Sequence, residues 1–309
     1  MTPETNAVNG LAEPQGIAPA RLAETRPLYW SIRREVWENR SIYIAPLIVA
    51  SVALFGFLIS TIMLPSRMRG LAALEPAQQR GSVILPFSMA ASVLLMTGFI
   101  VAAFYCFDAL YGERRDRSIL FWKSMPVSDR TTVLAKALIP LLVVPLIAFT
   151  IALVMQVIMV VLSTMVLLGN GMNPAMLWSR LPLFRMTLVM LYGLTAHVLW
   201  FAPIYGWLLL VSAWARRTPF LWAVLPFPAL TIVERMAFGT SHFASLLRYR
   251  IVGAMAEGFN VDPKTHLITR YSQLDPVGYL TSAGFWSGLL FAVACLIAAV
   301  RLRRNREPI

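Results

Sequence analysis

Residues 42–64 read IYIAPLIVASVALFGFLISTIML, an apolar run without one charged side chain. A helix needs about 20 apolar residues to cross the roughly 30 Å of hydrocarbon in a bilayer. The run does not alternate polar and apolar residues, as a strand of a membrane barrel would. Because a helix satisfies its own backbone hydrogen bonds in lipid, the stretch predicts a transmembrane α-helix.

Five further apolar runs follow along the chain, at approximately 84–107, 137–168, 183–214, 219–240 and 281–300. Of the 309 residues, 58% are hydrophobic and 14% are charged, whereas a soluble domain carries about a quarter of charged residues. The sequence therefore predicts an all-α polytopic membrane protein with six transmembrane helices.

The basic residues predict the orientation of these helices. With the N-terminus placed inside, the inner segments hold about twice as many Lys and Arg as the outer ones, and such residues are retained in the cytoplasm. We therefore expect both termini to be cytoplasmic. The same distribution explains the net charge of +12 by topology and anionic lipid rather than by nucleic-acid binding.

Motifs for catalysis are missing from the sequence. The only Lys-Ser and Lys-Thr pairs, at Lys123 and Lys264, lack the glycines of a phosphate-binding loop. No His-Glu-x-x-His or Gly-x-Ser-x-Gly pattern occurs, and the histidines are scattered. We expect no enzyme activity, no metal site and no cofactor on this chain.

A few polar residues fall within the predicted spans. Gln156 and His197 lie mid-span, where either a hydrogen bond between helices or a contact to a substrate in a pathway explains them. Asp108 is expected at the inner interface near the arginines that follow it. Cys106 and Cys295 are expected to be small packing residues.

The fifth run contains the adjacent charges Glu234 and Arg235. Its apolar residues nearly cancel the cost of inserting these charges, about 2.5 to 3.5 kcal/mol each at a helix centre. Two interpretations remain open: a structural ion pair at the outer boundary, which is favoured, or a polar feature of a pathway or gate. Pro226 and Pro228 predict a broken or kinked helix here.

The loop between the second and third runs, 108–136, contains GERRDRSILFWKSMPV at 112–127. Its apolar cluster is too short to cross a membrane and too apolar for a solvated loop. We expect a short helix that buries part of the cluster against either lipid headgroups or a cytoplasmic partner protein.

This segment resembles the loop after the second span in membrane subunits of ABC-2-type ATP-binding-cassette exporters. The family pattern begins with a Glu, matched by Glu113, and ends in Pro-Val-Ser, matched by 126–128. Ser118 stands where Thr is common, and Ile119 and Trp122 occupy apolar positions. Arg117 replaces the usual Gly, and Leu120 replaces a position that is often acidic.

The resemblance implies a permease subunit of the bacterial plasma membrane that forms an export pathway as a dimer, with a second copy or a close paralogue. Soluble ATPase subunits, which carry ATP and Mg, would bind the loop. The implied ATPase-coupling residues are Glu113, Arg114, Arg115, Asp116, Ile119, Leu120, Phe121, Trp122, Met125 and Pro126. An ion-coupled secondary transporter or a non-transporting regulatory membrane protein remain alternatives.

The resemblance also divides the chain. It implies a cytoplasmic interfacial helix at 27–41, with Leu28, Tyr29, Ile32 and Val36 along one face, before a transmembrane domain at 42–303. An outer segment at 241–280 is expected to contain helices at its start. Residues 1–26 and 304–309 are expected to be a disordered cytoplasmic tail and a basic C-terminal tail.

Overall fold

The computed structural model describes residues 26–71, 75–119, 121, 127–259 and 273–305. Six helical stretches are long and apolar enough to cross a membrane: Ser41–Thr61, Gln78–Arg115, Asp129–Gly169, Leu177–Trp214, Pro219–Phe238 and Ala283–Asn305. Within the described ranges no sheet forms, and the only pairing of extended chain is one bridge between Phe259 and Leu274. The predicted all-α fold with six spans is confirmed, and the chain is a multi-pass membrane protein.

The helices of the first three spans are, in chain order, α1 (Pro27–Glu38), α2 (Ser41–Thr61), α3 (Leu64–Leu71), α4 (Pro76–Asp108), α5 (Tyr111–Arg115), α7 (Asp129–Leu138), the π-helical turn η1 (Ile139–Val143) and α8 (Val144–Gly169). The remaining helices are α9 (Ala175–Arg180), α10 (Leu183–Trp214), α11 (Pro219–Val224), α12 (Pro226–Phe238), α13 (His242–Gly258), α14 (Pro276–Thr281) and α15 (Ala283–Asn305).

Prolines explain two irregularities in the spans. Pro140 lies in η1, where a π-helical turn interrupts the third span, because proline has no backbone N–H to donate to the preceding turn. In the fifth span α11 ends at Val224 and α12 begins at Pro226. The break predicted from Pro226 and Pro228 is thus confirmed.

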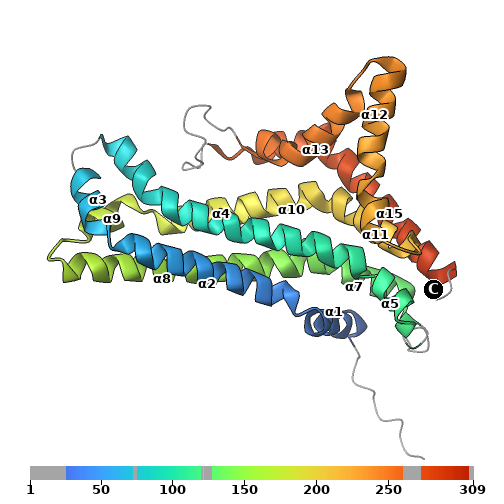
Figure 1. Cartoon of the computed structure of the whole chain (residues 1–309), viewed down its shortest axis with the longest axis horizontal. Helices are drawn as coiled ribbons and strands as arrows, with labels where there is room; N and C mark the ends of the chain where they lie inside the picture. The colour runs from blue at the N-terminus through green and yellow to red at the C-terminus, as the bar shows by residue number, and fades with distance from the viewer. Residues whose placement is uncertain (1–25, 72–74, 120, 122–126, 260–272, 306–309) are drawn as a thin grey trace, which may run out of the picture.

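Figure 1 shows an elongated bundle in which α2, α4, α8 and α10 run side by side. The first described helix, α1, lies at the same end of the bundle as α5, α7 and the last residues of α15, while α3 and α9 lie at the opposite end. The two ends are called the α1 end and the α3 end below. An even number of spans returns the chain to the side on which it began.

The two larger clusters of buried apolar side chains in the described residues lie one toward each end of the bundle. The first includes Ile42, Cys106 and Leu209, and the second includes Leu94 and Met155. Cys106 and Cys295 are both buried free thiols, as expected for packing residues. Since lipid is as apolar as these side chains, close packing rather than the hydrophobic effect holds such helices together.

The contact between α10 and α15 illustrates this close packing. A Cβ atom at Gly206 would lie 3.2 Å from both the Cα and the carbonyl oxygen of Ala292. Small residues at this crossing allow the two backbones to approach one another. The fourth and sixth spans therefore form a tight pair, and α15 is held along α10.

The helix expected before the first span is present as α1, but its buried face differs from the prediction. Ile32 and Val36 pack against the apolar cluster as expected. Tyr29 is 55% exposed, and Glu35, which is only 1% exposed, takes the centre of the face. The prediction was wrong at Tyr29 and did not include Glu35, because it assigned the face by hydrophobicity alone, whereas a charged partner in the bundle draws Glu35 inward.

Candidate functional site

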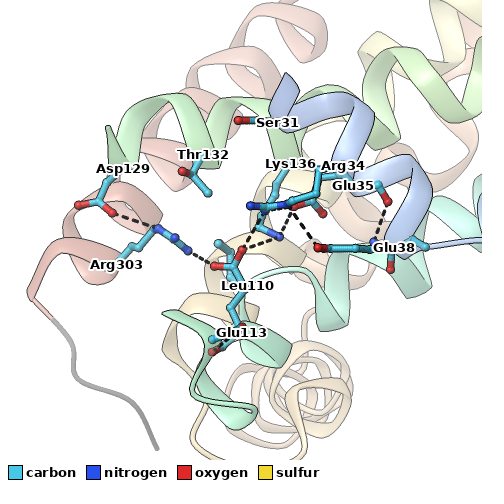
Figure 2. A network of polar contacts seen from close by, with 12 residues as sticks. Ser31, Arg34, Glu35, Glu38, Leu110, Glu113, Asp129, Thr132, Lys136 and Arg303 are labelled. Atoms are coloured by element: carbon cyan, nitrogen blue, oxygen red, sulfur yellow. Dashed lines mark hydrogen bonds and ion pairs between the residues drawn. The ribbon is translucent and has the colours of Figure 1, made fainter. Parts of the chain in front are cut away.

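A buried group of charges joins four helices at the α1 end of the bundle (Figure 2). Its centre is Lys136 of α7, whose Nζ donates to Oε1 of Glu35 at 2.8 Å and lies 3.2 Å from Oε1 of Glu113. The side chains of Glu35 and Lys136 are 2% and 3% exposed, and that of Glu113 is 9% exposed. Helices α1, α5 and α7 therefore meet through ionic contacts inside the protein.

Two arginines complete the group. Arg303, near the end of α15, donates through Nη1 to Oε2 of Glu113 and through Nε to Oδ1 of Asp129, the latter at 3.1 Å. Arg34 of α1 donates to Glu35 at 2.7 Å and to Glu113 at 3.4 Å. We call Arg34, Glu35, Glu113, Asp129, Lys136 and Arg303 the charge cluster.

The charge cluster pairs three cations with three carboxylates, which is the condition under which buried charges persist. Burial by itself would raise the pKa of the Glu35 carboxyl. The Lys136 ammonium and hydrogen bonds from Lys136, Arg34 and the Tyr105 hydroxyl outweigh it, so the pKa of Glu35 lies below its ordinary value. Glu35 is thus a permanently charged anchor at neutral pH.

The sequence of α7 places two of these charges on one face. Ser128 caps the helix by accepting a hydrogen bond from the Thr131 backbone N–H at 3.1 Å, and Asp129 follows in the first turn, where a negative charge is favourable. Lys136 comes seven residues, about two turns, after Asp129 and so projects from the same side. The Pro-Val-Ser sequence at 126–128 therefore ends in the cap of the helix that carries Lys136.

A second contact anchors the loop to the fourth span. Arg114 of α5 donates to the backbone oxygens of Ser212 and Ala215, at 2.8 and 2.6 Å, where α10 ends. The Ser212 hydroxyl in turn accepts from the backbone N–H groups of Leu110 and Tyr111 at the start of α5. The guanidinium satisfies carbonyls that a helix end leaves without partners, so α5 is fixed to α10.

The predicted coupling residues thus divide into buried and exposed groups. Glu113 and Arg114 are directed inward, to the charge cluster and to α10. Arg115 and Asp116 stay exposed and pair with each other at 2.9 Å, and Arg115 also lies 3.7 Å from Asp108, which is exposed as expected.

The apolar residues of the loop also include both buried and exposed side chains. Ile119 is 1% exposed, whereas Phe121 is 59% exposed. The other predicted coupling residues, Leu120, Trp122, Met125 and Pro126, lie outside the described residues.

The two mid-span candidates are not brought together with the charge cluster. Gln156 is buried in α8. His197 of α10 packs against the rings of both Phe99 and Phe201, each with its centroid 4.2 Å away. Neither residue makes a hydrogen bond to another helix within the described part of the chain, so the first of the two explanations left open by the sequence is not found there, and His197 makes aromatic contacts instead.

Glu234 and Arg235 do not form an ion pair in the described structure, so the favoured interpretation was wrong. The Glu234 carboxylate instead accepts from the Thr240 hydroxyl and from the backbone N–H groups of His242 and Phe243, at 2.7 to 2.8 Å. It therefore caps α13, whose preceding residue makes no side-chain cap. No residue of α12 is buried in the chain.

Six residues whose side chains connect different helices were not predicted as site residues. Five of them, Arg34, Glu35, Asp129, Lys136 and Arg303, belong to the charge cluster, and the spacing of Asp129 and Lys136 was the one available signal. Arg250 of α13 donates to the backbone oxygens of Trp200 and Gly284, at 3.2 and 2.8 Å, and its guanidinium lies 4.7 Å from the Trp200 ring centroid. Through these contacts Arg250 ties α13 to α10 and α15.

Comparison of the chain with protein-family models, with curated proteins and with solved structures finds no match.

Proposed function

We propose that this chain is the membrane subunit of an ATP-driven exporter of the ABC-2 type, coupled to separate ATPase subunits through the loop between its second and third spans. The observation that carries the proposal is the construction of that loop. Its polar start is anchored inside the chain by Glu113 and Arg114, while the aromatic ring of Phe121 is more than half exposed. An anchored loop with an exposed apolar residue suits a mechanical contact.

The charge cluster explains how a force on the loop would reach the spans. Glu113 binds both Lys136 at the start of the third span and Arg303 at the end of the sixth. Arg114 connects the same short helix to the end of the fourth. Movement of α5 would therefore displace several spans together, as rigid elements, rather than bend the loop alone.

The orientation of the chain in the membrane is consistent with this proposal. The excess of Lys and Arg in the predicted inner segments supports a cytoplasmic location of the α1 end, which is where a soluble ATPase would have access to ATP. One chain with six spans would form a pathway together with a second copy or a close paralogue. ATP and Mg would be bound by the ATPase.

Association of the ATPase with loop variants tests the proposal. The tagged full-length chain is expressed together with its candidate ATPase and purified in mild detergent. Phe121→Asp and Trp122→Asp are expected to insert normally and to lose most of the bound ATPase, since a charge would replace an apolar contact. Phe121→Leu serves as the matched control, because it keeps an apolar side chain and should retain binding. Retained binding and transport in both Asp variants would overturn the coupling role of the loop.

A further inference from the structure

A cavity of about 310 Å³ lies at the α3 end of the bundle, away from the charge cluster. It is enclosed by side chains of α2, α3, α4, α8 and α9, and most of its wall is apolar. The apolar residues include Phe57, Leu64, Met68, Val83, Phe87 and Leu177. Its volume is at the lower end of the range for small-molecule sites, roughly 300 to 1,000 Å³.

Three of the four hydroxyl groups in the wall offer little to a polar ligand, and the fourth belongs to Ser82, which is exposed. Ser60, Thr61 and Ser163 each donate to a carbonyl of their own helix, at 2.8, 2.6 and 2.8 Å. Their donor hydrogens are therefore occupied, and the interior suits a hydrocarbon chain rather than a sugar or a peptide.

Among the residues that the structure describes, Arg67 of α3 is the one charged residue that lines the cavity. It is exposed, and no carboxylate of the described chain lies within ion-pair distance of it. The cavity thus combines an apolar interior with one cation at its surface, an arrangement that matches a molecule with one hydrocarbon tail and an anionic head.

The charge of the surrounding segment also favours an anionic ligand. Between the first two spans the chain carries Arg67, Arg69 and Arg80 but only one acidic residue, Glu75. Such an excess of arginine is unfavourable at an end of the bundle that the topology places outside the cytoplasm. Anionic headgroups beside this segment would compensate the repulsion between the arginines.

We propose that this cavity binds an acyl chain of an anionic membrane phospholipid, with the headgroup phosphate on Arg67. The apolar wall would hold the chain, and the guanidinium would select a negatively charged head over a zwitterionic one. The site does not depend on the exporter proposal, because it uses neither the loop nor the charge cluster.

Native mass spectrometry of the full-length protein tests this site. Micelles contain equal amounts of phosphatidylglycerol and phosphatidylcholine with the same acyl chains. The wild type is expected to retain phosphatidylglycerol in preference to phosphatidylcholine. Arg67→Gln should reduce that preference about two- to fivefold, which is the range for an exposed charge pair. Arg69→Gln is the matched control, since it removes the same charge from the same helix at a residue that does not line the cavity.

The cavity itself is tested by Gly70→Leu. An added Cβ atom at Gly70 meets no atom within 4 Å, and leucine favours the helix more than glycine does, so the variant should fold. It should reduce binding of both lipids by at least about tenfold, because each methylene excluded from the cavity costs about fourfold in affinity. Inorganic phosphate in excess should not displace the lipid, since it has no chain.

Four results would overturn the proposal. Equal retention of the two lipids by the wild type would remove the role of Arg67. If Arg69→Gln lost the preference for phosphatidylglycerol as much as Arg67→Gln does, the preference would come from the general surface charge and not from Arg67. Displacement of the lipid by inorganic phosphate, or undiminished binding in Gly70→Leu, would show that the cavity holds no chain.

Discussion

Glu113 on α5 accepts a hydrogen bond from Arg303 near the end of α15, across 190 residues of sequence. The contact joins the loop after the second span to the last turns of the sixth. Both side chains are buried, and each has a further ionic partner, Lys136 for Glu113 and Asp129 for Arg303. The α1 end of the molecule is consequently one ionic unit rather than a set of independent helix ends.

The first prediction concerns this pair. Glu113→Gln and Arg303→Met should each lower the free energy of unfolding by about 3 to 5 kcal/mol, because each leaves a buried charge without its partner. The double variant should lose about 0.5 to 3 kcal/mol less than the sum of the two. Unfolding in mixed micelles measures the three values, and strict additivity would show that the two side chains do not interact.

A pH dependence follows from Glu35. Its pKa in the folded protein lies below the ordinary value of 4.5, so its contribution to stability is present above pH 4.5 and is lost as the pH falls through the lower folded value. Thermal unfolding in detergent, measured from about pH 6 to about pH 3, should show stability decreasing in the acid range. Glu35→Gln should weaken that decrease, and an identical pH profile in the variant would contradict the assignment.

The backbone conformation of Arg117 predicts the effect of replacing this residue on stability. This residue has φ +56° directly after the C-cap of α5, in the left-handed region that favours glycine at this position. Arg117→Gly should stabilise the protein by about 1 kcal/mol by relieving that conformation. Arg117→Ala is the control, because it removes the charge and keeps the strain. Equal stabilisation by both changes would mean that the charge, and not the backbone, is responsible.

Glu234 and Arg235 are predicted to act separately. Glu234→Ala should destabilise the protein by about 1 kcal/mol, since it removes the cap of α13, whereas Arg235→Ala should change stability by less than about 0.5 kcal/mol. The double variant should equal the sum of the two. A double variant more stable than Glu234→Ala alone would contradict this prediction and support the ion-pair interpretation of Glu234 and Arg235.

The sequence predicted the spans because their signal is local. The run at 42–64 and its five counterparts show the required length directly, and the break in the fifth span follows from Pro226 and its missing backbone N–H. The π-helical turn at Pro140 was not anticipated, although it has the same cause.

The charge cluster could not be predicted, because its contacts join distant segments. Glu35 and Lys136 are 101 residues apart, and a charged residue near a span end has the same sequence pattern whether it faces lipid headgroups or another buried charge. The inward direction of Glu113 and Arg114 depends on where α15 and α10 end. The cavity at the α3 end is likewise formed by five helices, and no local pattern encodes it.

We propose that this chain works with a separate ATPase. The most direct measurement is purification of the tagged protein from its native membrane in mild detergent, with quantitative mass spectrometry of the bound proteins and an ATPase assay of the eluate. We expect the eluate to contain a soluble ATPase with a phosphate-binding loop, in equal amount to this chain and active in ATP hydrolysis. A preparation with no ATPase and no ATP turnover would contradict it and favour an ion-coupled carrier or a regulatory membrane protein.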